Sequence, residues 1–132
     1  MTTTLRPSGP LRRADDDTLS RSYEVRVDGR PVGGVRIGTL RAPGRPLGTI
    51  ADLYVDEADR GRGRGAVAAL AAEEVLRGWR CGRVRISVPA AAPAALRLAA
   101  ALGYTRTGHI LAKDLGSADP GPRPRPDWRS AP

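Results

Sequence analysis

The chain has 132 residues, enough for one domain with one modest core but not for two lobes around a large substrate. Its formal net charge of +8 at pH 7 comes almost wholly from arginine, because Lys113 is the only lysine among 22 basic residues, and such a charge favours anionic partners. One cysteine, Cys81, and one histidine, His109, exclude an internal disulfide and argue against a zinc site or a Cys/His catalytic pair, so we expect no metal.

Turn signals divide the first half of the chain into antiparallel strands. Asp28-Gly29 follows a segment of alternating apolar and polar residues and predicts a hairpin turn. A stretch with two prolines and a glycine, residues 42–46, predicts a second turn. The polar stretch 11–20 is expected to form little structure. We expect strands over residues 2–6, 23–27, 32–40 and 48–55.

The second half should contain both helices. Residues 66–79 are rich in helix formers and carry apolar residues at helical spacing, which predicts a helix with one side buried on the sheet. Glu73 and Arg77, four residues apart, are expected to form a surface ion pair on it. Further segments follow: a strand over 83–88, a helix over 93–102 and a hairpin over 104–107 and 109–115. The pattern predicts an α/β fold with a mixed, mostly antiparallel sheet and two main helices.

The C-terminal residues differ in composition from the rest. Residues 116–132 are rich in proline and arginine and have almost nothing to bury, so we expect a single domain over residues 1–115 and a disordered tail over 116–132. The sequence has no apolar run of about 18 residues and no pattern of a secretion signal. We therefore expect a cytoplasmic protein without a membrane partner.

Arginine and glycine alternate over Arg60-Gly61-Arg62-Gly63-Arg64-Gly65, between an apolar strand and a long helix. Glycines let the backbone approach a ligand closely, the helix start offers N–H groups, and arginines add charge, so this placement predicts a phosphate-binding loop. A Walker-type loop would require Gly-Lys-Ser/Thr, which is missing. The dinucleotide fingerprint is matched only weakly by Gly63-x-Gly65-x-x-Ala68, because the preceding strands look antiparallel and no acidic residue ends the next strand.

A third phosphate-binding pattern fits better. The segment from Leu53 to Gly65 resembles the acetyl-CoA signature of the GNAT superfamily of acyl-CoA-dependent N-acyltransferases, in which Arg or Gln, two residues, Gly, one residue and Gly or Ala follow one another. Arg60, Gly63 and Gly65 fill these positions, and the resemblance extends over residues 23–115. It implies that the backbone of Leu53, Tyr54 and Val55 pairs with the pantetheine arm of acetyl-CoA. It also implies that residues Arg60, Gly61, Arg62, Gly63, Arg64 and Gly65 hold the pyrophosphate.

The catalytic residues are less clear from the sequence. The family commonly carries an Asn and a general-acid Tyr on its second helix, and the corresponding positions here hold Ala92 and Ala99. Tyr104 or a water molecule is the candidate substitute. Asp52, beside the pantetheine positions, is the candidate base or amine-binding group, although strand alternation places it opposite Leu53 and Val55. Glu24 is a weaker candidate; His109 is expected on the surface, and Asp56, Glu57 and Asp59 in a solvated turn.

The acceptor side of the resemblance differs from the family. The family places one or two helices between its first two strands, whereas only residues 7–22 are available here. This predicts a cleft open to a protein N-terminus or lysine side chain, or completed by a second copy in a homodimer. The leading function is acetyl transfer from acetyl-CoA to a primary amine. The alternatives are a non-catalytic CoA-binding domain, favoured by Ala92 and Ala99, and an arginine-rich nucleic-acid-binding module, which the shortage of aromatic residues disfavours.

Overall fold

The structure is a computed structural model that describes residues 2–88, 93–107 and 110–115. The positions Ala92 and His109 and the segment 116–132 lie outside these residues. The helices and strands, in chain order, are β1 Thr3–Pro7, β2 Arg12–Arg13, β3 Leu19–Val27, β4 Arg30–Leu40, β5 Leu47–Val55, the 3-10 helix η1 Glu57–Asp59, α1 Arg64–Gly78, β6 Arg83–Ile86, α2 Pro93–Ala101, β7 Thr105–Thr107 and β8 Ile110–Asp114.

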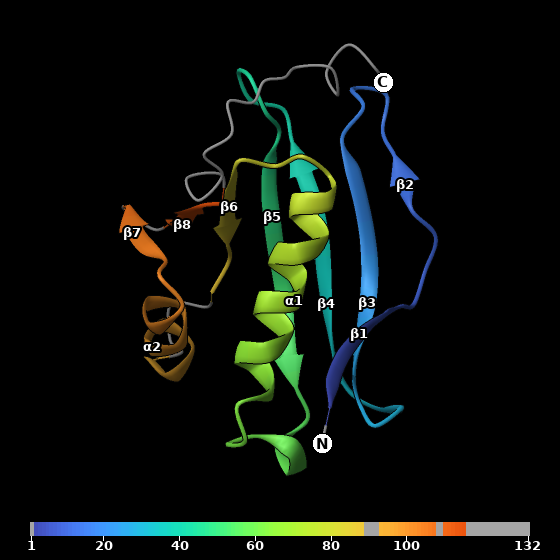
Figure 1. Cartoon of the computed structure of the whole chain (residues 1–132), viewed down its shortest axis with the longest axis vertical. Helices are drawn as coiled ribbons and strands as arrows, with labels where there is room; N and C mark the ends of the chain where they lie inside the picture. The colour runs from blue at the N-terminus through green and yellow to red at the C-terminus, as the bar shows by residue number, and fades with distance from the viewer. Residues whose placement is uncertain (1, 89–92, 108–109, 116–132) are drawn as a thin grey trace.

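The strands form one mixed sheet in the order β1-β3-β4-β5-β6-β8-β7, with β2 paired to β3 (Figure 1). All the pairings are antiparallel except that of β5 with β6, which α1 connects. The expected fold class is therefore confirmed. The hairpin at Asp28-Gly29 is confirmed too, because Val27 pairs with Arg30 and both turn residues have positive φ, 51° and 85°.

Both helices pack on one face of this sheet. The larger core cluster joins Leu76 of α1, Ala99 of α2 and Ile50 of β5, all at most 2% exposed. On β3, Tyr23 belongs to this cluster, and Val25 and Val27 belong to a second cluster with Ala68 of α1, whereas the residues between them are partly exposed. Among the described residues, the opposite face of the sheet carries no helix.

The stretch between β1 and β3 is more ordered than the sequence indicates. The prediction of little structure over residues 11–20 is wrong, because β2 pairs Arg12 with Ser20 and Arg13 with Leu19. Strand β3 accordingly begins at Leu19 rather than at residue 23. Since strands rather than helices occupy this stretch, they extend the edge of the sheet and leave its second face open.

Strand β5 is irregular at its C-terminal half. Gly34 of β4 pairs with Tyr54 and Arg36 pairs with Ala51, so β5 contains one extra residue opposite β4. This is a β-bulge, and Asp52 within it has φ of 55°. The parallel pairing with β6 covers only Leu47 to Ile50. Among the described residues, no strand pairs with Asp52–Val55 on the β6 side.

Candidate functional site

The Arg/Gly loop leads into the N-terminus of α1, where the backbone N–H groups of the first turn have no partner within the helix. Gly63 is the N-cap of α1, with φ of 74° and no side-chain cap. Gly61 also has positive φ, 78°, and a Cβ at either glycine would meet no atom within 4 Å. The first helical hydrogen bond runs from Val67 N to Gly63 O at 3.2 Å, and the first turn contains no acidic residue. An anion at this helix start would meet N–H donors and the positive end of the helix dipole.

The three arginines of the loop have three different environments. Arg60 donates from Nε to the carbonyl oxygen of Val55 at 2.8 Å and so fastens the loop to the end of β5. Arg62 is exposed and, within the described chain, makes no hydrogen bond or ion pair. Arg64 is only 5% exposed and pairs with Asp59. Arg62 is therefore the loop arginine best exposed to a bound phosphate.

Asp59 organises the approach to the loop. It is 6% exposed, so its predicted place in a solvated turn is wrong. Besides Arg64, its carboxylate accepts hydrogen bonds from Arg30, with Nη2 to Oδ1 at 3.0 Å. Hydrogen bonds from Arg30, with smaller contributions from Arg64, hold the pKa of Asp59 below its usual value. These contacts link the first residue of β4, the last residue of η1 and the first residue of α1, so both ends of the Arg/Gly loop are held in place.

The strand before the loop combines a core residue with an exposed aromatic one. Leu53 packs against both core clusters. Tyr54 is 56% exposed, and its ring lies against Gly34 of β4, where a Cβ would come within 2.9 Å of the ring. A Cβ at Gly33 would come within 2.1 Å of the Tyr54 carbonyl oxygen. The Gly33-Gly34 pair therefore makes room for the bulged strand and for this ring.

Asp52 is exposed at the bulge, away from the helices. Its Oδ2 lies 3.3 Å from Nη2 of Arg36 on β4, and both side chains are mostly in solvent. It therefore lies on the face opposite Leu53, as the strand alternation indicates. The weaker candidate, Glu24 on β3, accepts two hydrogen bonds from Arg26, at 2.7 and 2.9 Å.

Tyr104 belongs to a buried polar cluster rather than to an open surface. It is 5% exposed, and its hydroxyl donates to Oε2 of Glu73 at 2.8 Å. Burial, with the Glu73 carboxylate as the next cause, raises the pKa of Tyr104. Lys113 of β8 donates to both Glu73 oxygens, at 3.1 and 3.2 Å. Ala99, the position of the family's general acid, is buried at 2% exposure in the same core.

The predicted surface pair of Glu73 and Arg77 is wrong in its exposure. Glu73 is 1% exposed, and Arg77 reaches it only at 3.9 Å, while Tyr104 and Lys113 are its close partners. The sequence spacing identified a helical neighbour but not the two partners that arrive from distant strands. No local signal in the sequence pairs Glu73 with Lys113.

The described part of the chain has neither a metal-binding cluster nor a membrane-spanning helix. Within it, no group of three His, Cys, Asp or Glu side chains could hold a metal ion. Neither of its helices is both long and apolar enough to cross a membrane.

Known structures share this fold. The chain superposes on the NatC complex bound to Gag peptide and CoA with a TM-score of 0.64 and 19% identity, covering 71% of this chain and 70% of that one. It also matches a tandem GNAT protein from the clavulanic acid biosynthesis pathway, with TM-score 0.60 and 28% identity over 72% of this chain but 31% of that protein. The paia N-acetyltransferase from Thermoplasma acidophilum in complex with coenzyme A gives 0.61 and 15%, covering 73% and 61%. No curated protein gives a significant match.

The fold of this chain, a mixed sheet with both helices on one face, is that of these solved structures. The sequence profile described as "Acetyltransferase (GNAT) family" matches residues 3–104, most of the chain. The chain belongs to the acetyltransferase (GNAT) family, and the resemblance drawn from its sequence is confirmed.

Proposed function

We propose that this chain is an N-acetyltransferase that moves an acetyl group from acetyl-CoA to a primary amine by direct attack. The proposal rests on the order in which three structural features follow one another from β5 to the start of α1. A bulged, partly unpaired strand leads through a fixed turn into a glycine-rich helix start without acidic side chains. A linear ligand with a hydrogen-bonding arm and a diphosphate would match this order of features.

In this proposal the loop and strand bind acetyl-CoA at two points. The pyrophosphate is held by backbone N–H groups at the start of α1, with charge supplied by Arg62. The backbone of Leu53, Tyr54 and Val55, which lies beyond the pairing with β6, hydrogen-bonds the pantetheine arm. A backbone N–H near the bulge would also stabilise the negative charge that develops on the thioester oxygen.

The reaction requires one proton to leave the acceptor amine. The amine nitrogen attacks the thioester carbon, the C–N bond forms, the C–S bond breaks, and CoA leaves as a thiolate. Asp52 is the proposed acceptor of the amine proton, directly or through water, because its carboxylate is exposed at the bulge. Its ion pair with Arg36 would loosen as the ammonium of the substrate arrives.

The proton for the departing thiolate is harder to assign to one residue than the proton that leaves the amine. Tyr104 is the weaker catalytic candidate, because its hydroxyl is buried and already donates to Glu73. We assign this proton to water, since general acid help contributes ~10²–10⁴-fold and a thiolate is a good leaving group.

A non-catalytic CoA-binding domain is the second candidate function, and the buried Ala99 favours it. An arginine-rich nucleic-acid module loses support, because Arg60 and Arg64 contact groups of the protein itself.

Two measurements test the proposal. Calorimetric titration with CoA and acetyl-CoA should give micromolar affinity, and a thiol-release assay with a panel of amines and peptides should give turnover. Binding without turnover would favour the non-catalytic domain. Absence of binding to either ligand would overturn the loop assignment. Asp52→Asn should lower kcat while leaving CoA affinity unchanged, with Glu24→Gln as the matched carboxylate control on the same sheet face.

A further inference from the structure

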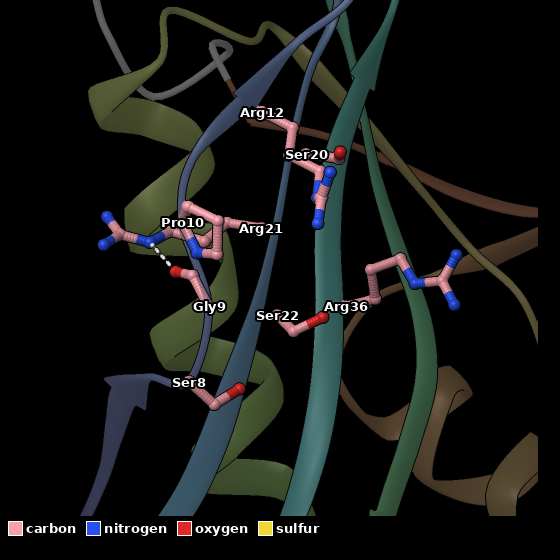
Figure 2. A pocket seen from close by; sticks show the side chains of 8 residues that line it. All are labelled: Ser8, Gly9, Pro10, Arg12, Ser20, Arg21, Ser22 and Arg36. Carbon is pink, nitrogen blue, oxygen red and sulfur yellow. Dashed lines mark hydrogen bonds between the residues drawn. The ribbon is translucent and has the colours of Figure 1, made fainter.

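The open face of the sheet contains a hollow of about 430 Å³ where the β1–β2 connection folds beside β3. The side chains that line it are basic or polar, apart from Pro10. Three arginines and three serines line it, and no acidic side chain does; the full lining is Ser8, Gly9, Pro10, Arg12, Ser20, Arg21, Ser22 and Arg36 (Figure 2). Guanidinium and hydroxyl donors are suited to an anionic ligand with several oxygen atoms. Of the three arginines, Arg36 is paired with a carboxylate outside the hollow, that of Asp52.

Backbone contacts hold the wall of this hollow in place. Ser8 donates from its backbone N–H to the Ser22 carbonyl oxygen at 2.9 Å. Arg21 donates from Nε to the Gly9 carbonyl oxygen at 2.9 Å, the dashed line in Figure 2. Arg21 therefore holds the β1–β2 connection against β3, and the other residues that line the hollow keep fixed backbone positions.

The available donors are Arg12 and the serine hydroxyl groups. Arg12 pairs in register with Ser20, which places both side chains on the same face of the sheet. Figure 2 shows the Arg12 guanidinium beside Ser20, with the Ser22 hydroxyl further along the same strand. Within the described residues, neither the Arg12 guanidinium nor the Ser20 and Ser22 hydroxyls make a hydrogen bond or ion pair. These donors are therefore available to the oxygen atoms of a carboxylate or phosphate.

One side chain connects the hollow to the proposed acetyl-transfer site. Arg36 lines the hollow, extends from β4 toward β5, and pairs with Asp52 at 3.3 Å. Ser22, Arg36 and Ala51 are successive cross-strand partners on β3, β4 and β5. Two strand spacings, ~10 Å, therefore separate Ser22 in the hollow from the bulge.

We propose that the hollow binds an anionic oxygen group, carboxylate or phosphate, of the acyl acceptor, and that the acceptor amine then lies ~10 Å away at Asp52. This inference rests on the proposed function and names its substrate class: amines that carry a negative charge several bonds from the nitrogen. An α-amino acid does not fit, because its amine and carboxylate are attached to one carbon.

The first experiment examines the hollow without any enzyme reaction. The apo full-length chain, labelled with ¹⁵N, is titrated with inorganic phosphate. Saturable shifts should appear at the amides of Gly9, Ser20 and Ser22, and Arg12→Gln should weaken the apparent affinity about tenfold. Arg12→Lys should retain part of it, and Arg6→Gln, the same charge change outside the hollow, should retain all of it. Shifts that are absent, or equal in Arg12→Gln and Arg6→Gln, would overturn the anion site.

The second experiment measures acetyl transfer with acceptors matched in length. The acceptors are 8-aminooctanoate, its neutral amide, and an aminoalkyl phosphate of the same length, the last separating phosphate from carboxylate recognition. We expect about tenfold higher kcat/KM for a charged acceptor than for the amide. Arg12→Gln should remove this preference through KM, while Arg6→Gln keeps it. Equal transfer to all three acceptors would overturn the inference while the acetyltransferase stands. Phosphate shifts without transfer to any amine would instead overturn the proposed function together with the acceptor role of the hollow.

Discussion

Replacing Gly63 with alanine tests whether the backbone conformation of the loop is what binds the cofactor. Gly63 has φ of 74°, a left-handed conformation that costs a residue with a Cβ about 1–2 kcal/mol. No atom lies within 4 Å of the added Cβ, so no clash within the protein adds to this cost. Gly65→Ala is the matched control, since its Cβ would make an ordinary contact with Leu98 at 3.5 Å. Alanine also has the higher helix propensity there.

The strain at position 63 can appear in either of two measured quantities. If the free loop keeps its conformation, the apo protein loses the full 1–2 kcal/mol of stability, and CoA affinity is unchanged. If the free loop relaxes, apo stability is retained, and CoA affinity falls by about 5- to 30-fold instead. The sum of the two changes should be about 1–2 kcal/mol in both cases. Urea denaturation of the apo protein and calorimetric titration with CoA supply the two terms.

The control variant decides the interpretation. Gly65→Ala should cost nothing: the sum should lie between zero and a gain of about 1 kcal/mol, because alanine has the higher helix propensity. The reasoning would be refuted if Gly63→Ala also cost nothing, or if Gly65→Ala lost as much as Gly63→Ala. The second result would mean that space in front of the helix start, rather than backbone conformation, limits binding.

Three further changes test the parts that support the site. The pKa of Asp59 is lowered mainly by Arg30, so the carboxylate stabilises the folded state only while it is ionised. In urea titrations, the free energy of unfolding of the wild type should exceed that of Asp59→Asn by a constant amount above about pH 5 and by less below about pH 4. A difference that grows toward acid would contradict this assignment. Glu73→Gln should cost about 3 kcal/mol of unfolding free energy, whereas the exposed Glu74→Gln should cost under about 0.5 kcal/mol, both measured by denaturation; similar costs would show that the cluster is not stabilising. Burial raises the pKa of Cys81 to about 12, so a thiol reagent at pH 8 should react only after unfolding; rapid reaction of the folded protein would show that the thiol is accessible.

The features that could be predicted from the sequence depend on neighbours along the chain. The hairpin at Asp28-Gly29 follows from two residues that tolerate positive φ, and the structure confirms it. The glycine-rich loop was recognisable for the same reason. By contrast, Glu73 bonds Tyr104 and Lys113, which lie 31 and 40 residues away, so no spacing rule could identify those partners.

The bulge in β5 was missed because alternation carries no sign of an inserted residue. A signal for it existed on the neighbouring strand, where Gly33-Gly34 interrupts an otherwise apolar pattern. Glycine inside a strand often marks a bulge or a close approach of another chain segment. Here both glycines face the bulged part of β5, one beside the Tyr54 carbonyl and one beside its ring. The pair could therefore have predicted the irregularity, although not that Asp52 would lie in it.

In the proposed reaction, the segment between β1 and β3 would determine how the chain selects an acceptor. Because it pairs as strand β2 instead of forming helices, the described residues leave the face with Asp52 and Tyr54 open. An open face cannot exclude wrong amines by enclosing them. Its side chains can still distinguish them by charge, although exposed charges are screened over about 8 Å at physiological salt. Arg12 and Arg36 lie on strands that are in turn held by backbone pairing, so their positions do not depend on a closing loop. In the proposed reaction, selectivity on this face would therefore depend on where an amine carries its negative charge, more than on the shape of the rest of the molecule.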